Sequence, residues 1–155
     1  MASMIGSKVE RKEDKKFLTG KGRYTADINL HNQLHAVFVR SPHARAKIKG
    51  IDTSKAKRAA GVVDVLTGKD MQDDKIGGLI AGWKIVSKDG TDMKCPAHPP
   101  LATDSVNYVG DHIALVVAET LQEAKDAADL VKVDYKVLKA VVDPAEAMKS
   151  DAIHD

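Results

Sequence analysis

Ile113-Ala114-Leu115-Val116-Val117-Ala118-Glu119-Thr120-Leu121-Gln122-Glu123 joins an unbroken aliphatic run to a helix-start signal. Six consecutive aliphatic residues suit a strand covered on both faces, so residues 113–118 are predicted to be central in a sheet. Thr120 and Glu123 have the spacing of a capping box, in which each side chain accepts a hydrogen bond from the other residue's amide. Residues 131–137 then alternate apolar and polar side chains, the period of a half-exposed strand. The stretch therefore predicts a β-α-β unit.

The helix of this unit is predicted to carry a narrow apolar stripe. Leu121, Ala124, Ala128 and Val131 recur at three- and four-residue spacing, and the two alanines would let the helix backbone lie close to the sheet. The polar residues between them are expected to face water.

The first half of the chain shows the same alternation of strands and helices. Residues 34–40 and 46–51 are predicted strands, separated by a turn at Pro42, which cannot donate to a strand ladder. A helix is expected over residues 55–60, with acceptors at 52–54 before it and Gly61 to end it, followed by a strand at 62–66. Near the end, Asp143 and Pro144 predict a short helix that ends near Met148.

Residues 69–100 form a long excursion with little expected regular structure beyond residues 82–86. The segment contains paired glycines at 77–78, an Asp-Gly turn signal at 89–90 and three prolines between 96 and 100. Long irregular segments in compact domains are usually functional or mobile. We expect this excursion to be mobile or to become ordered by a partner.

Length and composition fit one domain with an aliphatic core. The chain has 155 residues, 43% of them hydrophobic, but only 4% aromatic, and a net charge of +2. The single Cys95 excludes an internal disulfide and any metal or iron–sulfur site built from cysteines alone, which favours a reduced, cytoplasmic setting. The first residues lack the apolar run of a signal peptide, and no stretch approaches a membrane span of roughly 20 apolar residues.

The near-neutral net charge hides an uneven distribution. Residues 8–23 contain seven basic and three acidic residues, residues 40–58 contain seven and one, and residues 119–155 contain five and nine. A basic face can bind nucleic acid or another anionic partner, but few aromatic residues lie among the basic ones to stack on bases. We therefore favour a solvated face, or a surface that meets an acidic partner domain, over nucleic-acid binding.

Two local patterns have the residue types of a binding site but not its spacing. Gly20-Lys21-Gly22 lacks the following Ser or Thr and the earlier glycine of a phosphate loop, and Thr25 stands where a dinucleotide fingerprint needs its third glycine. It is interpreted as a structural turn. His31 and His35 are four apart in a turn that enters a strand, where such residues lie roughly 13 Å from each other, too far for one metal.

Cys95, His98 and His112 could meet only through the tertiary fold. The first two lie in the proline-rich part of the excursion, and His112 begins a predicted buried strand. No Ser/His/Asp order or paired acidic motif stands out either. From the residues alone we predict no catalytic, cofactor-binding or metal-binding residue.

Several phrases, in a fixed order, resemble one known family. They are Val9-Glu10-Arg11-Lys12-Glu13-Asp14 with Phe17 to Ile28, His35 to Ile48, Gly61 to Asp70, His98-Pro99-Pro100-Leu101-Ala102, Tyr108 to Glu119, and Val133-Asp134-Tyr135 leading to Asp143-Pro144. Each phrase alone is weak, but the ordered set is specific. It resembles the amino-terminal α/β-hammerhead domain of the molybdopterin-binding large subunit in the xanthine dehydrogenase and aldehyde oxidase family, and is most similar to carbon monoxide dehydrogenase-type large chains.

The resemblance implies an α+β fold of the α/β-hammerhead type, with a mixed sheet, two short β-α-β units and the long excursion. It also implies a division into an amino-terminal extended segment packing on the domain (1–33), the hammerhead domain (34–149) and the start of a linker to missing downstream domains (150–155). In this family the parent enzyme oxidises a small substrate at a molybdopterin centre, and iron–sulfur clusters and FAD on partner subunits or segments carry the electrons away.

The resemblance implies no catalytic residue in this segment. The molybdopterin-binding loops and the catalytic glutamate belong to later domains, so the chain is expected to be a structural and assembly domain, inactive by itself. Its expected partners are the rest of the large subunit and the iron–sulfur and FAD subunits. A free-standing module that binds an anionic partner is the alternative. The residues expected to matter are structural: Gly22, Gly61, Gly110, Pro42, Thr120 and Glu123.

Overall fold

The computed structural model describes residue 6 and residues 11–150. Predictions that fall on residues 1–5, 7–10 and 151–155 lie outside the described residues; these include the start of the first basic stretch, the phrase at residues 9–10 and nearly all of the expected linker. The chain divides into two compact units, Met1–Gln33 and Leu34–Asp155, and each is described by itself. That residues 1–33 pack on the domain stays a prediction.

The first unit contains a short helix, α1 (Asp14–Leu18), and a 3₁₀ turn, η1 (Thr25–Asp27). The rings of Phe17 and Tyr24 stack with their centroids 5.5 Å apart. Gly20, with φ +70°, takes the left-handed turn. A Cβ at Gly22 would lie 2.6 Å from Cδ1 of Phe17, so Gly22 is required for contact with this ring and not, as predicted, for a backbone turn.

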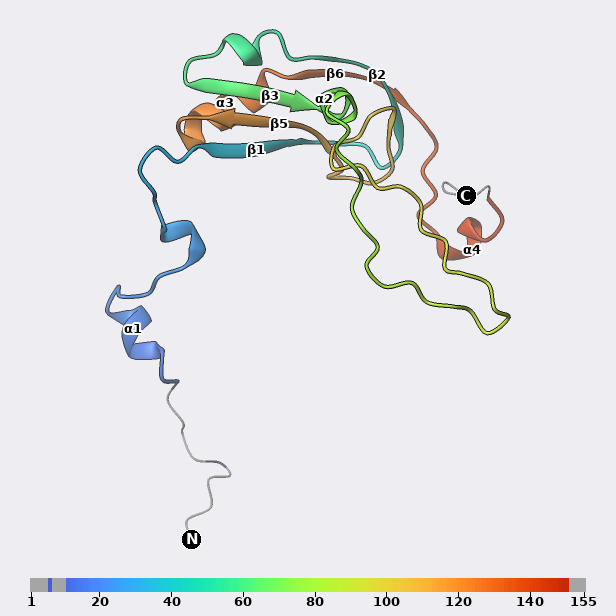
Figure 1. Cartoon of the computed structure of the whole chain (residues 1–155), viewed down its shortest axis with the longest axis horizontal. Helices are drawn as coiled ribbons and strands as arrows, with labels where there is room; N and C mark the ends of the chain where they lie inside the picture. Colours follow the sequence, from blue (N-terminus) through green and yellow to red (C-terminus); the bar gives the residue numbers. More distant parts are fainter. Residues whose placement is uncertain (1–5, 7–10, 151–155) are drawn as a thin grey trace. The chain divides into compact units, whose positions relative to one another are not determined.

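The second unit holds six strands and the remaining helices described for the chain (Figure 1). Its elements in chain order are β1 (His35–Arg40), β2 (Ala46–Asp52), η2 (Ala56–Arg58), β3 (Val62–Thr67), α2 (Gly68–Asp73), β4 (Ser105–Val106), β5 (His112–Ala118), α3 (Leu121–Asp129), β6 (Lys132–Val137) and α4 (Pro144–Ala147).

The strands form two three-stranded sheets, ordered β1-β5-β3 and β4-β2-β6, and every pairing in them is antiparallel. The α+β class is confirmed. The prediction of a single mixed sheet with two β-α-β units is wrong, because α3 carries the chain from β5 in one sheet to β6 in the other. Side-chain periodicity reports which face of a strand is buried, but not which strand lies beside it.

β5 is the central strand of its sheet, as predicted, but its two faces differ. Ala114, Val116 and Ala118 are fully buried on the side of α3, whereas Leu115 and Val117 on the opposite face are only half-buried. A register shift opposite β1 leaves Ile113 without a partner residue. Such a bulge re-aims a side chain, and Ile113 is fully buried in the core of the other sheet.

The capping box at the start of α3 is present as predicted. Oγ1 of Thr120 accepts a hydrogen bond from the amide of Glu123 at 3.2 Å, and Oε2 of Glu123 accepts from the amide and the hydroxyl of Thr120 at 3.1 and 2.7 Å. Ala124 and Ala127 are fully buried, and Ala127 packs with Val65 and Val116. The predicted stripe was wrong at one end: Leu121 is exposed, and Ala127 takes the buried place.

A second core lies between β2, β4, β6 and the bulge of β5. Ala46, Val106 and Ile113 are fully buried there, and Val133 and Tyr135 of β6 pack against them. The alternation predicted for residues 131–137 is confirmed up to Lys136, because the two half-buried side chains of β6 face this core and its lysines are exposed. Val137, at the end of the strand, is exposed.

The turn at Pro42 does not end a hairpin, because β1 and β2 belong to different sheets. Ser41, the one buried polar residue in the described part of the chain, fixes this connection instead. Its amide donates to the carbonyl of Asp111 at 2.9 Å, and its carbonyl accepts from the amide of Gly110 at 2.8 Å. Gly110 has φ +91°, so the turn predicted there is confirmed.

Two helix predictions change in length. The helix expected over residues 55–60 is only the 3₁₀ turn η2, and Gly61 follows it with φ +71°. In contrast, residues 69–73 of the expected irregular excursion belong to α2, whose capping box of Thr67 and Asp70 was not predicted from the sequence. The terminal helix α4 is confirmed, with Asp143 accepting from the amides of residues 145 and 146.

The rest of the excursion has no helix or named strand among its described residues; one isolated bridge joins Val86 to Asp92. Figure 1 shows it, in green to yellow, extending away from the strands. Across the described ranges, no helix has both the length and the apolar character needed to cross a membrane.

Candidate functional site

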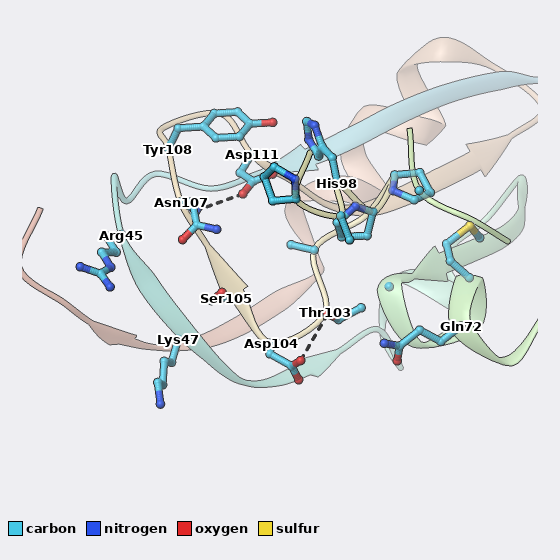
Figure 2. Close-up of a pocket in the computed structure, with 18 of the residues that line it drawn as sticks. Arg45, Lys47, Gln72, His98, Thr103, Asp104, Ser105, Asn107, Tyr108 and Asp111 are labelled. Atoms are coloured by element: carbon cyan, nitrogen blue, oxygen red, sulfur yellow. Dashed lines mark hydrogen bonds between the residues drawn. The ribbon is translucent and has the colours of Figure 1, made fainter. Parts of the chain in front are cut away.

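A groove of about 680 Å³ lies between α2, the start of β2, β4 and the end of the excursion (Figure 2). Its lining includes Arg45, Gln72, His98, Asn107, Tyr108 and Asp111, together with three prolines at 96, 99 and 100. It is larger than a second hollow of about 390 Å³ between residues 139 and 150, so it is taken as the candidate functional site.

One wall of the groove depends on a glycine at the first position of α2. A Cβ at Gly68 would overlap the carbonyl oxygen of Ala102 and lie 2.8 Å from its carbonyl carbon. Both residues are buried, and only the missing side chain lets α2 approach the segment before β4. The capping box then fixes the direction of the helix, because Oδ2 of Asp70 accepts from the amide and hydroxyl of Thr67 at 2.7 and 2.6 Å. The hydroxyl donor also lowers the pKa of the Asp70 carboxyl below its usual 3.8.

The excursion crosses back over itself at the groove. The amide of Leu79 donates to the carbonyl of His98 at 2.8 Å, and a Cβ at Gly78 would lie 2.8 Å from the same oxygen. The ring of His98 meets that of Tyr108 edge-on, with centroids 6.5 Å apart. These contacts hold the outgoing and returning parts of the excursion together at its base.

The third wall is a polar turn between β4 and β5. Oδ2 of Asp111 accepts from the amide of Asn107 at 3.1 Å. Desolvation, followed by the negative charge of Asp111, raises the pKa of the Tyr108 hydroxyl above its usual 10. The Tyr108 hydroxyl therefore stays protonated at neutral pH.

The groove does not fit an anionic pterin cofactor of the kind that the family resemblance implies for the parent enzyme. A bound phosphate needs converging cations or backbone amides. Figure 2 shows the side chains of Arg45 and Lys47 pointing away from His98, and the carboxylates of Asp104 and Asp111 also line the groove. We therefore derive no chemical step through that cofactor in this segment. The mixed charges and prolines suit contact with polypeptide.

The residues considered from the sequence as candidate ligands lie in different elements of the described chain. Cys95 is exposed in the excursion, His98 lies in the groove, and His112 stacks on Phe38 with ring centroids 4.2 Å apart. His31 lies in the turn of the first unit, and His35 begins β1 of the second. Within the described ranges, no three His, Cys, Asp or Glu side chains gather in a way that could hold a metal ion.

The basic stretch at residues 40–58 is partly paired with acidic side chains. Nζ of Lys49 lies 3.9 Å from Oδ1 of Asp134, and Nζ of Lys57 lies 3.7 Å from Oδ1 of Asp64. Both pairs are exposed, so each contributes little to stability. They break up the basic face on which the anionic-partner hypothesis depends, and that hypothesis stays untested.

Sequence reasoning missed the groove. The signal that could have located part of it is the Thr67-Gly68-Lys69-Asp70 capping box, which places a helix directly after β3. The approach of the segment 96–100 to that helix had no local signal.

Comparison with known proteins gives a consistent result over nearly the whole chain. Residues 19–139 match the family model described as "Aldehyde oxidase and xanthine dehydrogenase, a/b hammerhead domain". The nicotine 6-hydroxylase large subunit of Paenarthrobacter nicotinovorans is 42% identical over 97% of this chain and 18% of its own length. The carbon monoxide dehydrogenase large chain of Afipia carboxidovorans is 40% identical over 96% of this chain and 17% of its own.

A solved structure supports the same relationship. The crystal structure of quinoline 2-oxidoreductase from Pseudomonas putida 86 superposes with a TM-score of 0.79 at 36% identity, covering 95% of this chain and 18% of that one. The chain thus spans less than a fifth of the length of each of these proteins.

Proposed function

This chain belongs to the aldehyde oxidase and xanthine dehydrogenase a/b hammerhead domain family, and from that premise we propose that it is the assembly domain of a molybdenum hydroxylase large subunit. Its role is to pack against the cofactor-binding segments of that subunit and help orient them. The observation that carries the proposal is the match along almost the whole chain to only 17–18% of two large subunits.

The parent enzyme, in this proposal, oxidises a small substrate at a molybdopterin centre held by segments other than this one. Iron–sulfur clusters and FAD on partner subunits receive the electrons. The groove supports this division of labour, because its carboxylates and outward-pointing cations do not suit a phosphorylated pterin. Activity would then belong to the assembly and not to this chain alone.

The proposed domain organisation is the one expected from the sequence: an amino-terminal segment (1–33), the hammerhead domain (34–149) and the start of a linker (150–155). A cytoplasmic setting is also part of the proposal and rests on the single cysteine.

The experiment is reconstitution from two polypeptides. The partner is the remainder polypeptide, defined as the 82% (100 − 18 = 82) of the Paenarthrobacter nicotinovorans nicotine 6-hydroxylase large subunit that this chain does not match. The purified chain is titrated into it, and co-elution, molybdenum content and dye-coupled nicotine oxidation are measured before and after mixing. The positive control is the relative's own matching segment.

Stoichiometric co-elution, with activity only in the mixture, is the expected result. If the relative's own segment associates with the remainder polypeptide and this chain does not, the proposal is wrong. Oxidation by this chain alone would also contradict it.

A further inference from the structure

The excursion carries an unusual concentration of exposed apolar side chains. Six large apolar residues between 76 and 86 are 50% to 90% exposed: Ile76, Leu79, Ile80, Trp83, Ile85 and Val86. Ile80 and Trp83 are the most exposed, at 90% and 83%. We call residues 76–86 the apolar arm. Leaving this much apolar surface in water is unfavourable, and contiguous apolar surface usually marks an interaction site.

The apolar arm has a defined backbone at its base and at its tip. At the base, the amides of Ile76 and Leu79 donate to the carbonyls of Met71 and His98 at 2.9 and 2.8 Å. Beyond the tip, the amide of Met93 donates to the carbonyl of Ile85 at 2.9 Å, and residues 87 and 91 are joined by a 2.8 Å hydrogen bond. These hydrogen bonds hold both ends of the arm before a partner binds, which lowers the entropy cost of binding.

The charges next to the apolar arm are mixed, because Asp73, Asp74 and Asp89 lie directly outside its flanking lysines on either side. Between residues 75 and 88 the chain has three lysines, Lys75, Lys84 and Lys88, and no aspartate or glutamate. Within the arm itself the only charged residue is Lys84, so a complementary surface would be mainly apolar.

Another apolar surface of the second unit is less exposed. On the open face of the β1-β5-β3 sheet, Phe38 is 41% exposed and its ring is stacked by His112 and approached by Arg40. Leu115 and Val117 beside it are half-buried. Covering the apolar arm would therefore remove more apolar surface from water, and stabilise a complex more, than covering this face.

We propose that the apolar arm is the element by which this domain docks on the rest of the large subunit, where an apolar surface covers it. This inference rests on the proposed function. The relatives argue for this occupant. The match to the nicotine 6-hydroxylase large subunit spans 151 of the 155 residues, so it takes in the arm, and the other 82% (100 − 18 = 82) of that subunit's length lies in the same chain.

The experiment uses the fact that Trp83 is the only tryptophan of the chain. Labelling this chain with 5-fluorotryptophan gives one ¹⁹F resonance, which reports on the arm alone when the unlabelled remainder polypeptide is added. The expected result is a shifted and broadened resonance that saturates with the binding curve. The Ile80→Asp/Ile85→Asp variant is expected to weaken the Kd by about 10-fold or more, since interface hot spots are apolar anchors.

Leu18→Asp is the matched control. Leu18 is as exposed as Ile80, at 87%, but it lies outside the apolar arm and outside the family match at residues 19–139. It is expected to leave the Kd within about 2-fold of the wild-type value. Circular dichroism of both variants checks that the fold is kept.

The outcomes separate the two proposals. If the wild-type chain binds the remainder polypeptide while the ¹⁹F resonance stays unchanged and the double variant binds equally well, the arm is not the docking element and the assembly function stands. Equal weakening by Leu18→Asp also contradicts a specific role for the arm. If the relative's own segment binds and the wild-type chain does not, both proposals fail. A resonance that shifts with the concentration of this chain alone identifies a second copy as the occupant and overturns the inference.

Discussion

Gly61 lies in the turn between η2 and β3, against the side chain of Glu123 at the start of α3. Its replacement by alanine gives a sharp test of the fold. Its φ of +71° is a backbone conformation that side chains other than glycine rarely adopt. A Cβ there would also overlap the carboxylate of Glu123, which caps α3 through Thr120. The Gly61→Ala substitution therefore has two costs, one in the backbone and one in the cap.

The magnitude follows from adding these two costs. A left-handed residue with a Cβ costs about 1–2 kcal/mol, and loss of a helix cap costs about 1 kcal/mol. We expect Gly61→Ala to lower the free energy of unfolding by about 2–3 kcal/mol. Gly110→Ala is the matched control, because Gly110 has φ +91° but open space around its missing Cβ. Gly110→Ala should therefore lower the free energy of unfolding only by the backbone cost of about 1–2 kcal/mol.

Urea unfolding of four proteins forms a double-mutant cycle: wild type, Gly61→Ala, Glu123→Ala and the double variant. In the Glu123→Ala background the cap is already lost and the obstructing carboxylate is gone. Gly61→Ala should then cost about 1 kcal/mol less than it does in the wild-type chain. Additive effects, within about 0.5 kcal/mol, would show that the cap and the glycine are independent and that this reasoning is wrong.

Three further predictions concern packing and pH. Gly68→Ala should destabilise the domain by about 1–3 kcal/mol in urea unfolding, because the added Cβ meets backbone that cannot move aside. The control is Gly50→Ala, at a site with open space, which should change stability by no more than about 0.5 kcal/mol. Ala127→Leu should cost about 1–3 kcal/mol by overpacking the fully buried face of α3, and an unchanged melting temperature would contradict the close approach of this helix. Asp70 has a lowered pKa in the folded chain because the Thr67 hydroxyl donates to it. Its stabilisation is present above the ordinary pKa of 3.8 and is lost as pH falls through the folded pKa. Asp70→Asn should therefore flatten the acid limb of stability against pH, and an unchanged limb would refute the assignment.

The elements that could be predicted from the sequence are those with a local physical signal. The capping box at Thr120 and Glu123 joins residues three apart, and the cap at Asp143 does the same, so neither needs the rest of the fold. The alternation in β6 is local for a similar reason, since successive side chains of a strand point to opposite faces. The family relationship was also visible in the sequence, as an ordered set of phrases that the match to residues 19–139 confirms.

Tertiary structure decided the features that depend on contacts between distant residues. Strand order is one, because the antiparallel pairing of β5 with both β1 and β3 leaves no trace in the pattern of any single strand. The groove is another, since it needs Gly68 and Ala102 to meet from segments more than thirty residues apart.

The exposure of the apolar arm belongs with these features. Ile80 and Trp83 are residue types that are usually buried, so from the sequence alone they would be expected in the core. Only the fold shows that the domain completes its two aliphatic cores without them. Composition and local spacing determined the class and the caps of this protein, and the ordered phrases indicated its family. Whether each apolar side chain lies inside or outside was decided by which distant surfaces were left to cover it.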